Sequence, residues 1–323
     1  MKLKFIDLFC GVGGFRQALE PRGHQCLLSS DWDPDAQSIY QQNYGESPLG
    51  DIKKIPATDI PEHDILCAGF PCQPFSISGN QKGFADARGT LLYDILRVAD
   101  ASKPKVLLLE NVRNYLSHEH GRTMNLTLKL LRNGGYDVFF QVLNSSNFGV
   151  PQKRERLFFV CFRKDLEINQ FSFPKPGDVD VVLKDILLPD DDPRLDALWV
   201  SREDLVLNEL NSVGRANKPI RVGTVGKGGQ GERVYSTQGH AITLSAFGGG
   251  IGAKTGLYRF GQRIRRLHPE ECRKIMGFSD QFIMHPKHNV CFKQFGNSVV
   301  VPVVSSIVGQ IEKALRTSCL KAA

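Results

Sequence analysis

One cysteine lies where a chain can present a nucleophile. Cys72 stands between Pro71 and Pro74, directly after the apolar run Asp64–Ala68, which has the composition of a short buried strand. Each proline fixes its own φ and disfavours helix in the residue before it, so the thiol lies on a stiff turn just past a strand. Open α/β sheets bind their ligands at such strand ends. A structural cysteine in a proline-rich turn fits the same local pattern.

A carboxylate and an arginine cluster follow further along the chain. Glu110 closes the apolar run Val106–Leu109, where partial burial would raise its pKa and make it a usable proton donor. The cluster Gln152–Arg156 precedes another apolar run and offers arginines to a phosphate or a base edge. Each segment also has an ordinary explanation. The acid could cap the following helix, and the cluster could be a solvated turn.

A glycine-rich turn near the N-terminus is suited to binding a small molecule. Cys10–Gly14 joins the apolar run Phe5–Phe9 to the start of a helix, which lets backbone approach a ligand closely. Asp31 ends the next strand-like run, about 20 residues further on, where an acid can bind ribose hydroxyls. The spacing is G-x-G-G, which favours a nucleoside-type cofactor over one with a pyrophosphate. Glycine turns after strands are common, so a purely structural turn is an equal alternative.

Alternating strands and helices must position these residues, and they predict a doubly wound, mostly parallel α/β sheet. From Asp185 to Arg266 this alternation is replaced by glycine and basic residues, which indicates a second, smaller domain. We expect a discontinuous catalytic domain over 1–184 and 296–323, and a recognition domain with its hinge over 185–295. The expected strands are Phe5–Phe9, Cys26–Ser30, Asp64–Ala68, Val106–Glu110, Tyr136–Leu143 and Arg156–Phe162; the expected helices are Gly89–Ala101, Thr123–Asn133, Pro269–Met276 and an apolar segment Val299–Ala314.

Composition narrows the class of protein. A net charge of +7 favours a polyanionic partner, and nucleic acid is the first candidate. The eight cysteines lack paired C-x-x-C spacing, so we expect no disulfide framework and no metal site. The N-terminus is too charged for a signal peptide, and no apolar run approaches the roughly 18 residues of a membrane helix. These features predict a cytoplasmic protein.

Five segments together resemble the cytosine-specific DNA methyltransferases that modify ring carbon 5, in that family's order and over essentially the whole chain. They are Phe9-x-Gly11-x-Gly13-Gly14, Pro71-Cys72-Gln73, Glu110-Asn111-Val112, Gln152-Lys153-Arg154-Glu155-Arg156 and Gly296-Asn297-Ser298-Val299. The resemblance implies a Rossmann-like S-adenosylmethionine-dependent fold and methyl transfer to cytosine in duplex DNA. It also implies a bacterial restriction–modification setting. The sequence does not reveal whether a restriction endonuclease acts beside the protein, which we expect to be a monomer.

The resemblance also implies roles for the catalytic residues. Cys72 matches the nucleophile, whose thiolate adds to carbon 6 so that carbon 5 can take a methyl group. Glu110 matches the group that protonates ring nitrogen 3, Arg156 contacts the carbonyl oxygen of the base, and Arg154 helps to hold the site. No residue in the sequence identifies itself as the base that removes the carbon-5 proton.

By the same resemblance, two further sets of residues bind the ligands. The flipped-out base would be covered by a lid over 76–88, with Ser78 and Gln230 filling the vacated space. The residues expected to hold S-adenosylmethionine are Phe9, Gly11, Val12, Gly14, Asp31, Trp32, Asp51, Ile52, Pro71, Leu91, Asn297 and Val299, and those expected to contact DNA are Ser76, Ser78, Arg88, Lys227, Gln230, Arg233 and Phe247.

The variable segment Gly226–Ser245 resembles that of a GCGC-specific member of the family, so we predict that target, methylated at its internal cytosine. Arg233 is the residue expected to read a guanine, and Lys227 the one expected to meet phosphate. The alternative for Arg233 is a pairing with Glu232 or with a phosphate. Three residues depart from the expected pattern, namely Gln238, His240 and Phe247, which replaces a tyrosine.

Other functions compete with this prediction. A methyltransferase for exocyclic amines would carry an Asp/Asn-Pro-Pro-aromatic loop, which the sequence lacks. An RNA cytosine methyltransferase of the same fold is closer, and the recognition segment disfavours it. A catalytically silent DNA-binding regulator would not need Cys72, Glu110 and Arg156 together.

Overall fold

The structure is a computed structural model that describes residues 1–71, 91–177, 180–208 and 214–322. The chain folds into two compact units, which are described one at a time. The first unit comprises Met1–Leu143, Glu155–Lys175 and Val303–Ala323, and the second comprises Asn144–Arg154 and Pro176–Pro302. The second domain was expected over 185–295, whereas the second unit runs from Pro176 to Pro302 and also includes Asn144–Arg154, a segment expected in the first domain.

The first unit is built on a six-stranded sheet in the order β2-β1-β3-β4-β6-β5. Neighbours from β2 to β4 pair in parallel, and β6 pairs antiparallel with β4. The predicted α/β fold is therefore confirmed, with an antiparallel strand that local composition does not reveal. The strands are β1 (Lys4–Leu8), β2 (Gln25–Ser30), β3 (Ile65–Gly69), β4 (Val106–Val112), β5 (Tyr136–Asn144) and β6 (Glu155–Arg163).

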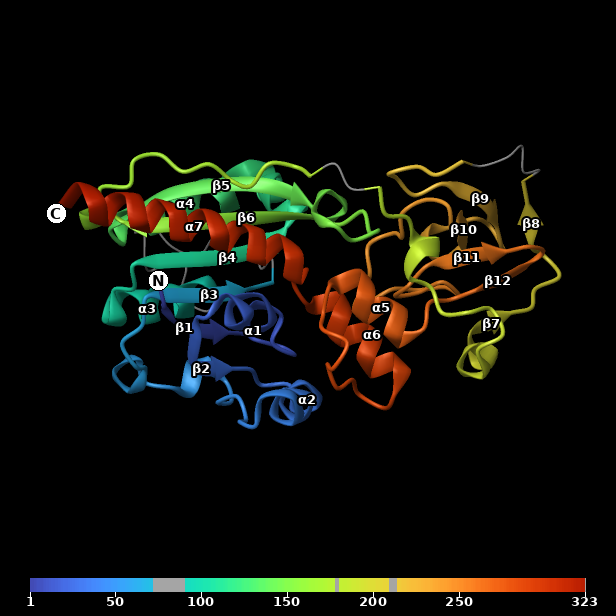
Figure 1. The fold of residues 1–323 in the computed structure, drawn as a ribbon, viewed down its shortest axis with the longest axis horizontal. Coiled ribbons are helices and arrows are strands. Elements are labelled where there is room, and N and C mark those ends of the chain that lie inside the picture. The colour runs from blue at the N-terminus through green and yellow to red at the C-terminus, as the bar shows by residue number, and fades with distance from the viewer. Residues whose placement is uncertain (72–90, 178–179, 209–213, 323) are drawn as a thin grey trace. The chain divides into compact units, whose positions relative to one another are not determined.

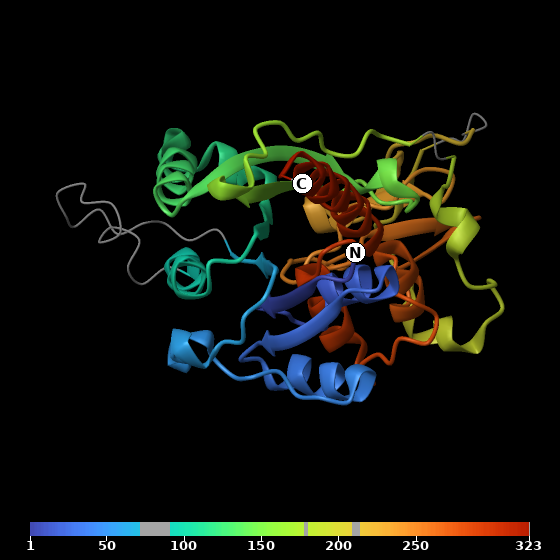
Figure 2. The same cartoon turned by 60° about the vertical axis from the view of Figure 1, so that its left-hand side comes forward.

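Helices cover both faces of this sheet. Alternate residues of β1 point to opposite faces, so Ile6 and Leu8 join the core beneath α3 and α4, while Phe5 and Asp7 face the other side. Figures 1 and 2 show α1 and α7 on the face opposite α3 and α4. The helices of this unit are α1 (Gly14–Leu19), α2 (Pro34–Tyr44), α3 (Leu91–Ser102), α4 (Arg122–Asn133) and α7 (Val301–Ala322).

The end of the chain returns to the first unit through α7. Glu312 on this helix accepts hydrogen bonds from Arg22 and lies 2.9 Å from His24 Nε2. By length and composition, the helical segment His288–Leu320 is apolar enough to cross a membrane, with 56% of its apolar window buried inside the molecule. No such segment was expected, because polar residues interrupt the apolar runs of this window. A core helix of a soluble protein has the same properties.

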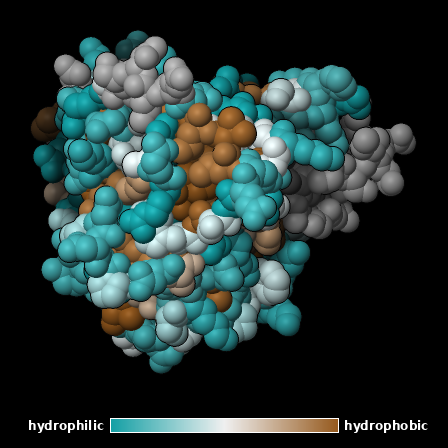
Figure 3. All heavy atoms as spheres, turned by 90° about the vertical axis from the view of Figure 1, so that its right-hand side faces the viewer, coloured by the Kyte–Doolittle hydropathy of each residue, from teal (hydrophilic) through white to brown (hydrophobic). Residues whose placement is uncertain are grey.

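The second unit holds a mixed sheet of short strands in the order β7-β12-β11-β10-β9-β8. Its small core is formed by five buried residues, Val222, Val225, Val234, Leu257 and Ile264. Figure 3 shows one face of the molecule, on which hydrophilic side chains surround an apolar patch. The elements are β7 (Trp199–Val200), β8 (Val206–Leu207), β9 (Arg221–Thr224), β10 (Arg233–Ser236), β11 (Leu257–Phe260), β12 (Arg263–Arg265), α5 (Pro269–Met276) and α6 (His288–Asn297).

Candidate active site

The glycine turn after β1 has a backbone that few residues can adopt. Gly11 and Gly13 have φ of 53° and 86°, and Phe9 has φ of 57°, although it carries a side chain. A left-handed conformation outside glycine costs roughly 1–3 kcal/mol, and such strain gathers at ligand sites. A Cβ on Gly13 would lie 2.6 Å from the Tyr44 ring, so this position tolerates only glycine. Glycine is therefore required at this position both for its backbone conformation and because the Tyr44 ring packs closely against it.

Asp31 and Trp32 lie at the end of β2, beside this turn. Asp31 Oδ2 accepts a hydrogen bond from Gly11 N at 2.8 Å, and its other oxygen accepts from Asp33 N at 2.9 Å. Burial raises the pKa of Asp31, while these two backbone amides lower it. Trp32 is 76% exposed, which is unusual for so large an apolar side chain. A half-buried carboxylate next to an exposed indole is a suitable arrangement for a ribose and an adjoining ring.

The segment that carries Asp51 and Ile52 runs alongside the end of β2. Leu49 pairs with Ser30, and Ser30 Oγ donates to Gly50 O at 2.8 Å. Asp51 caps a short 3₁₀ helix by accepting from Lys53 N at 3.0 Å. The structure thus brings together the predicted cofactor residues on the ends of β1 and β2. Of the others in the first unit, Pro71 is exposed, and Leu91 is half-buried at the start of α3.

Glu110 and Arg156 meet at the edge of the same sheet. Glu110 stands opposite Gly69 on β3 and Phe158 on β6, and Arg156 stands opposite Val112. Arg156 Nε lies 3.1 Å from Glu110 Oε1, and 18% and 11% of these two side chains remain exposed. The pair is consequently close to solvent and lies beside the end of β3, the strand that precedes Pro71.

Asn111 has a role that was not predicted from the sequence, although it lies within one of the quoted motifs. Its side chain is 1% exposed and donates to Phe70 O at 2.8 Å, while Phe70 N donates to Glu110 O at 3.3 Å. These bonds fix the chain at the end of β3, two residues before Cys72. A polar residue that interrupts an apolar strand was the available signal. Cys72, Ser76, Ser78 and Arg88 lie outside the described residues.

Arg154 belongs to the second unit and is 2% exposed. Its guanidinium donates to three backbone carbonyls, those of Leu244 at 2.9 Å, Gly296 at 3.0 Å and Ser298 at 2.8 Å. A Cβ on Gly296 would lie 2.3 Å from Ala246 N, so two backbones approach closely here. Arg154 therefore holds together the recognition segment and the segment that carries Asn297 and Val299.

The predicted DNA contacts of the second unit are exposed. Lys227, Gln230 and Arg233 are exposed on the surface, and Phe247 is 76% exposed. Glu232 accepts a hydrogen bond from Gly229 N at 2.8 Å, which closes the turn before β10. The ion pairs of the described residues do not include one between Arg233 and Glu232, and the alternative of a phosphate contact for the arginine stays open. Of the three departures, His240 is 1% exposed, while Gln238 is half-buried.

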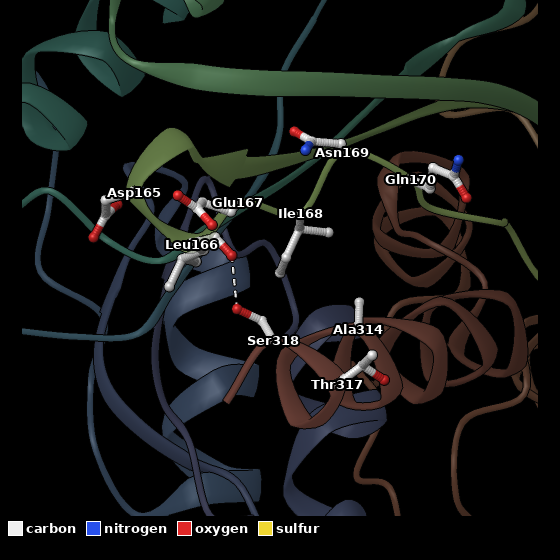
Figure 4. A pocket seen from close by; sticks show the side chains of 9 residues that line it. All are labelled: Asp165, Leu166, Glu167, Ile168, Asn169, Gln170, Ala314, Thr317 and Ser318. Atoms are coloured by element: carbon white, nitrogen blue, oxygen red, sulfur yellow. Dashed lines mark hydrogen bonds between the residues drawn. The ribbon is translucent and has the colours of Figure 1, made fainter. Parts of the chain in front are cut away.

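A separate cavity of about 820 Å³ lies in the first unit, away from these residues. It opens between the segment Asp165–Gln170 and the last turns of α7, where Ser318 Oγ donates to Leu166 O at 2.6 Å (Figure 4). Its lining contains none of the residues predicted to act in the site. We assign the cavity no function.

Comparison with known proteins identifies the class that this fold and site define. Residues 3–313 match the family model for C-5 cytosine-specific DNA methylases. The chain belongs to that family and is a DNA (cytosine-5-)-methyltransferase.

Individual relatives narrow the relationship. The chain is 50% identical over 313 residues to the type II methyltransferase M.HhaI of Haemophilus parahaemolyticus, covering 97% of this chain and 95% of that protein. It is 39% identical to M.HaeII of Haemophilus aegyptius, over 98% and 95% of the two chains. The crystal structure of the S. pombe Dnmt2 methyltransferase superposes with a TM-score of 0.73 at 19% identity, over 98% and 99% of the chains, and this likeness concerns the fold alone.

Proposed function

We propose that the protein transfers the methyl group of S-adenosylmethionine to carbon 5 of the internal cytosine of GCGC in duplex DNA, through a covalent adduct with Cys72. The observation that best supports this chemistry is the Glu110–Arg156 pair at the adjoining ends of β4 and β6. The pair lies next to Phe70, which Asn111 holds in place and from which the chain leads to Cys72. The reaction type is that of the family to which the chain belongs. The nucleophile, the target sequence and the residue roles are our inference.

The cofactor-binding residues fit S-adenosylmethionine. Gly11 has open space where a Cβ would lie, and Phe9 is held in a strained backbone, so the turn can present its peptide groups closely to a ligand. The Asp31 carboxylate is suited to ribose hydroxyls, and the exposed Trp32 ring suits an adenine or a sulfonium. Asp51, Asn297 and Val299 would complete the site. When bound, the cofactor supplies an electrophilic methyl group.

The chain's own residues then act on the flipped-out cytosine. The thiolate of Cys72 forms a bond to carbon 6, which makes carbon 5 nucleophilic. Glu110 hydrogen-bonds or protonates ring nitrogen 3, and Arg156 donates to the carbonyl oxygen of the base, so both stabilise the charge that develops on the ring. Arg156 also keeps the Glu110 carboxyl in place. After methylation, loss of the carbon-5 proton allows the sulfur to leave.

Covalent trapping tests the reaction. A GCGC duplex with 5-fluorocytosine at the target should form a stable adduct, because fluorine cannot leave as a proton does. Cys72→Ala should bind the duplex, form no adduct and transfer no methyl group, whereas Cys161→Ala removes a buried thiol and should still form the adduct. An adduct with Cys72→Ala would refute the assignment. A parallel assay with tRNA distinguishes the RNA-modifying alternative.

Specificity rests on the exposed face of the recognition segment. A planar guanidinium can bond both acceptors on the edge of guanine, and loss of such a pair costs about 1–3 kcal/mol of discrimination. In a duplex library randomised at four positions, we expect the wild type to prefer GCGC and Arg233→Ala to lose discrimination at one position. Lys227→Ala should weaken binding to all DNA sequences alike and reduce the salt dependence of binding. An unaltered preference in Arg233→Ala would contradict the assignment.

The setting of the activity follows from the same reasoning. We infer a monomer that acts on duplex DNA in the bacterial cytoplasm as the modification enzyme of a restriction–modification system. M.HhaI and M.HaeII are type II methyltransferases, and a cognate endonuclease would act independently on the same site. Bisulfite sequencing of plasmid DNA from cells that express the protein reports the reaction, the target and the methylated position together.

A further inference from the structure

Tyr44, the last residue of α2, lies against the backbone of the glycine turn. Its hydroxyl is 3.2 Å from Gly13 O and 3.4 Å from Val12 O, and it accepts a hydrogen bond from Gln17 Nε2 at 3.1 Å. Because the Gln17 amide is a donor, the single proton of the tyrosine hydroxyl is directed to the turn carbonyls. The hydroxyl therefore links the end of α2 to the two peptide groups before α1.

The ring of Tyr44 is itself fixed from behind. The guanidinium carbon of Arg16 lies 4.5 Å from its centroid, and the ring of Tyr40 packs at 4.4 Å. Arg16 is 9% exposed and is held by Glu20 at 2.8 Å, by Tyr40 at 3.2 Å and by Glu46. The ring occupies the space that a side chain at Gly13 would need. The Tyr44 side chain is thus held in place where it contacts the turn.

The opposite side of the turn is held by a residue proposed to contact the cofactor. Asp31 Oδ2 accepts from Gly11 N at 2.8 Å, so the turn is held through a peptide N–H on one side and through peptide carbonyls on the other. Glycine-rich backbone has many accessible conformations, and ordering it on binding costs affinity. Holding it in advance reduces that cost.

We propose that the Tyr44 hydroxyl is a positioning group that pre-orders the turn for S-adenosylmethionine. The inference rests on the proposed cofactor site and adds a residue that does not itself need to touch the cofactor. Its effect should fall on cofactor binding, since the Tyr44 hydroxyl bonds Gln17 and the carbonyls of the glycine turn.

Tyr44→Phe tests this, because it keeps the ring and its contact with Arg16 and removes only the hydroxyl. A hydrogen bond of this kind contributes about 0.5–1.5 kcal/mol, so the dissociation constant for S-adenosylmethionine by calorimetry should rise about two- to tenfold. The KM for the cofactor should rise in parallel. At saturating cofactor, kcat and the KM for DNA should stay within about twofold of wild type.

Tyr40→Phe is the matched control. Tyr40 is fully buried and its hydroxyl accepts from Arg16, and its hydrogen bonds within the described part of the chain include no carbonyl of the turn. This variant should lower the melting temperature and reduce cofactor affinity less than Tyr44→Phe does, because the Tyr40 ring still packs on Tyr44 and Glu20 and Glu46 still hold Arg16. Wild-type affinity in Tyr44→Phe, or an equal loss in Tyr40→Phe, would overturn the inference while the cofactor proposal stands. A wild-type protein that binds no S-adenosylmethionine would overturn the cofactor proposal itself and this inference with it.

Discussion

Two ion pairs, one in each unit, combine the same kinds of side chain and differ in how far water reaches them. In the first unit Arg156 Nε lies 3.1 Å from Glu110, and both side chains keep some exposure. In the second unit Arg265 lies 2.8 Å from Glu271, and neither side chain is exposed. The comparison separates a carboxylate that can meet a substrate from one that cannot.

Every oxygen of the sealed carboxylate is engaged. Oε1 of Glu271 accepts from Arg265 and Leu188 N, and Oε2 accepts from Arg265 and His268 N. The Arg265 guanidinium also lies 4.2 Å from the Phe260 ring centroid. The pair therefore ties β12, the start of α5 and the segment at Leu188 together, and we assign it to stability. Breaking such a pair leaves a buried charge without a partner.

Removing the sealed carboxylate should have the largest effect. We expect Glu271→Ala to lower the free energy of unfolding of the second unit by about 3–5 kcal/mol, measured by urea denaturation. Glu270→Ala, on the same helix, is the control, because Glu270 is partly exposed and its ion-pair contacts with Arg194 and Arg273 are 3.5 and 3.4 Å. That variant should stay within about 1 kcal/mol. Similar losses in both variants would remove the distinction between sealed and exposed carboxylates.

The Glu110–Arg156 pair, which water reaches in part, should show the opposite pattern. Glu110→Gln should lower kcat by about 10²–10³-fold, because a neutral amide stabilises the charge on the ring poorly, and should lower stability less than Glu271→Ala does, because the amide keeps the shape of the side chain and both partners retain some contact with water. Glu155→Gln is the neighbouring control, since Glu155 pairs with Arg113 on the surface. It should retain activity. A kcat near wild type in Glu110→Gln would show that this pair, too, is structural.

The sequence predicted the first unit well, because its strands are apolar and longer than those of the second unit. Boundaries moved where pairing extends beyond the apolar run. β4 continues to Val112 because its ladder with β6 includes Arg156, a partner remote in sequence. The six strands of the second unit were not predicted, since strands of two to four residues are too short for an alternating pattern.

The residues of the candidate site also divide into those that the sequence predicted and those that it did not. Glu110 and Arg156 were found through motifs, and the structure brings them together. Asn111 and Tyr44 were not found, because their contacts are with backbone carbonyls, which leave no mark on spacing. The burial of Glu271 was not predicted either, since only the fold determines which acids are sealed from water.

Asp7 extends the comparison to a buried carboxyl with no cation bound to it. It is 0% exposed, and neither oxygen has a hydrogen-bond partner within the described structure. Burial raises the pKa of Asp7 well above its usual value, and the charge of Asp31 raises it further, while Arg16 lowers it. A raised pKa means that stability is full below the unfolded value of about 3.9 and is lost as pH rises towards the folded value.

Asp7→Asn should remove that dependence. Between pH 5 and 8 the difference in unfolding free energy between the variant and the wild type should move in favour of the variant by up to about 1.4 kcal/mol per pH unit. Urea denaturation at several pH values measures this difference. Asp35→Asn, at an exposed position on α2, should run parallel to the wild type. A difference for Asp7→Asn that is constant with pH would contradict the buried neutral acid.

Removal of the Glu312 carboxylate should have the smallest effect on stability, and this effect should change with pH in the opposite direction to that of Asp7. Its side chain is 13% exposed, and burial alone would raise its pKa, but the hydrogen bonds from Arg22 and His24 lower it overall. Because Leu3 N donates to His24 Nδ1, the proton of that ring lies on Nε2 and points to Glu312. A lowered pKa gives stability that is present above the unfolded value of about 4.3 and is lost as pH falls through the folded value.

Glu312→Gln should therefore cost about 1 kcal/mol at pH 7 and progressively less below about pH 4.3, measured by chemical denaturation of the first unit. Asp165 provides the matched control, because Arg163 lowers its pKa as well, yet 57% of its side chain is exposed. Water screens that pair, so Asp165→Asn should leave the denaturation midpoint unchanged both at pH 7 and below about pH 4.3. If Asp165→Asn instead matched Glu312→Gln, exposure would not be what separates the ion pairs of this molecule, and the contrast between Glu110 and Glu271 would need another cause.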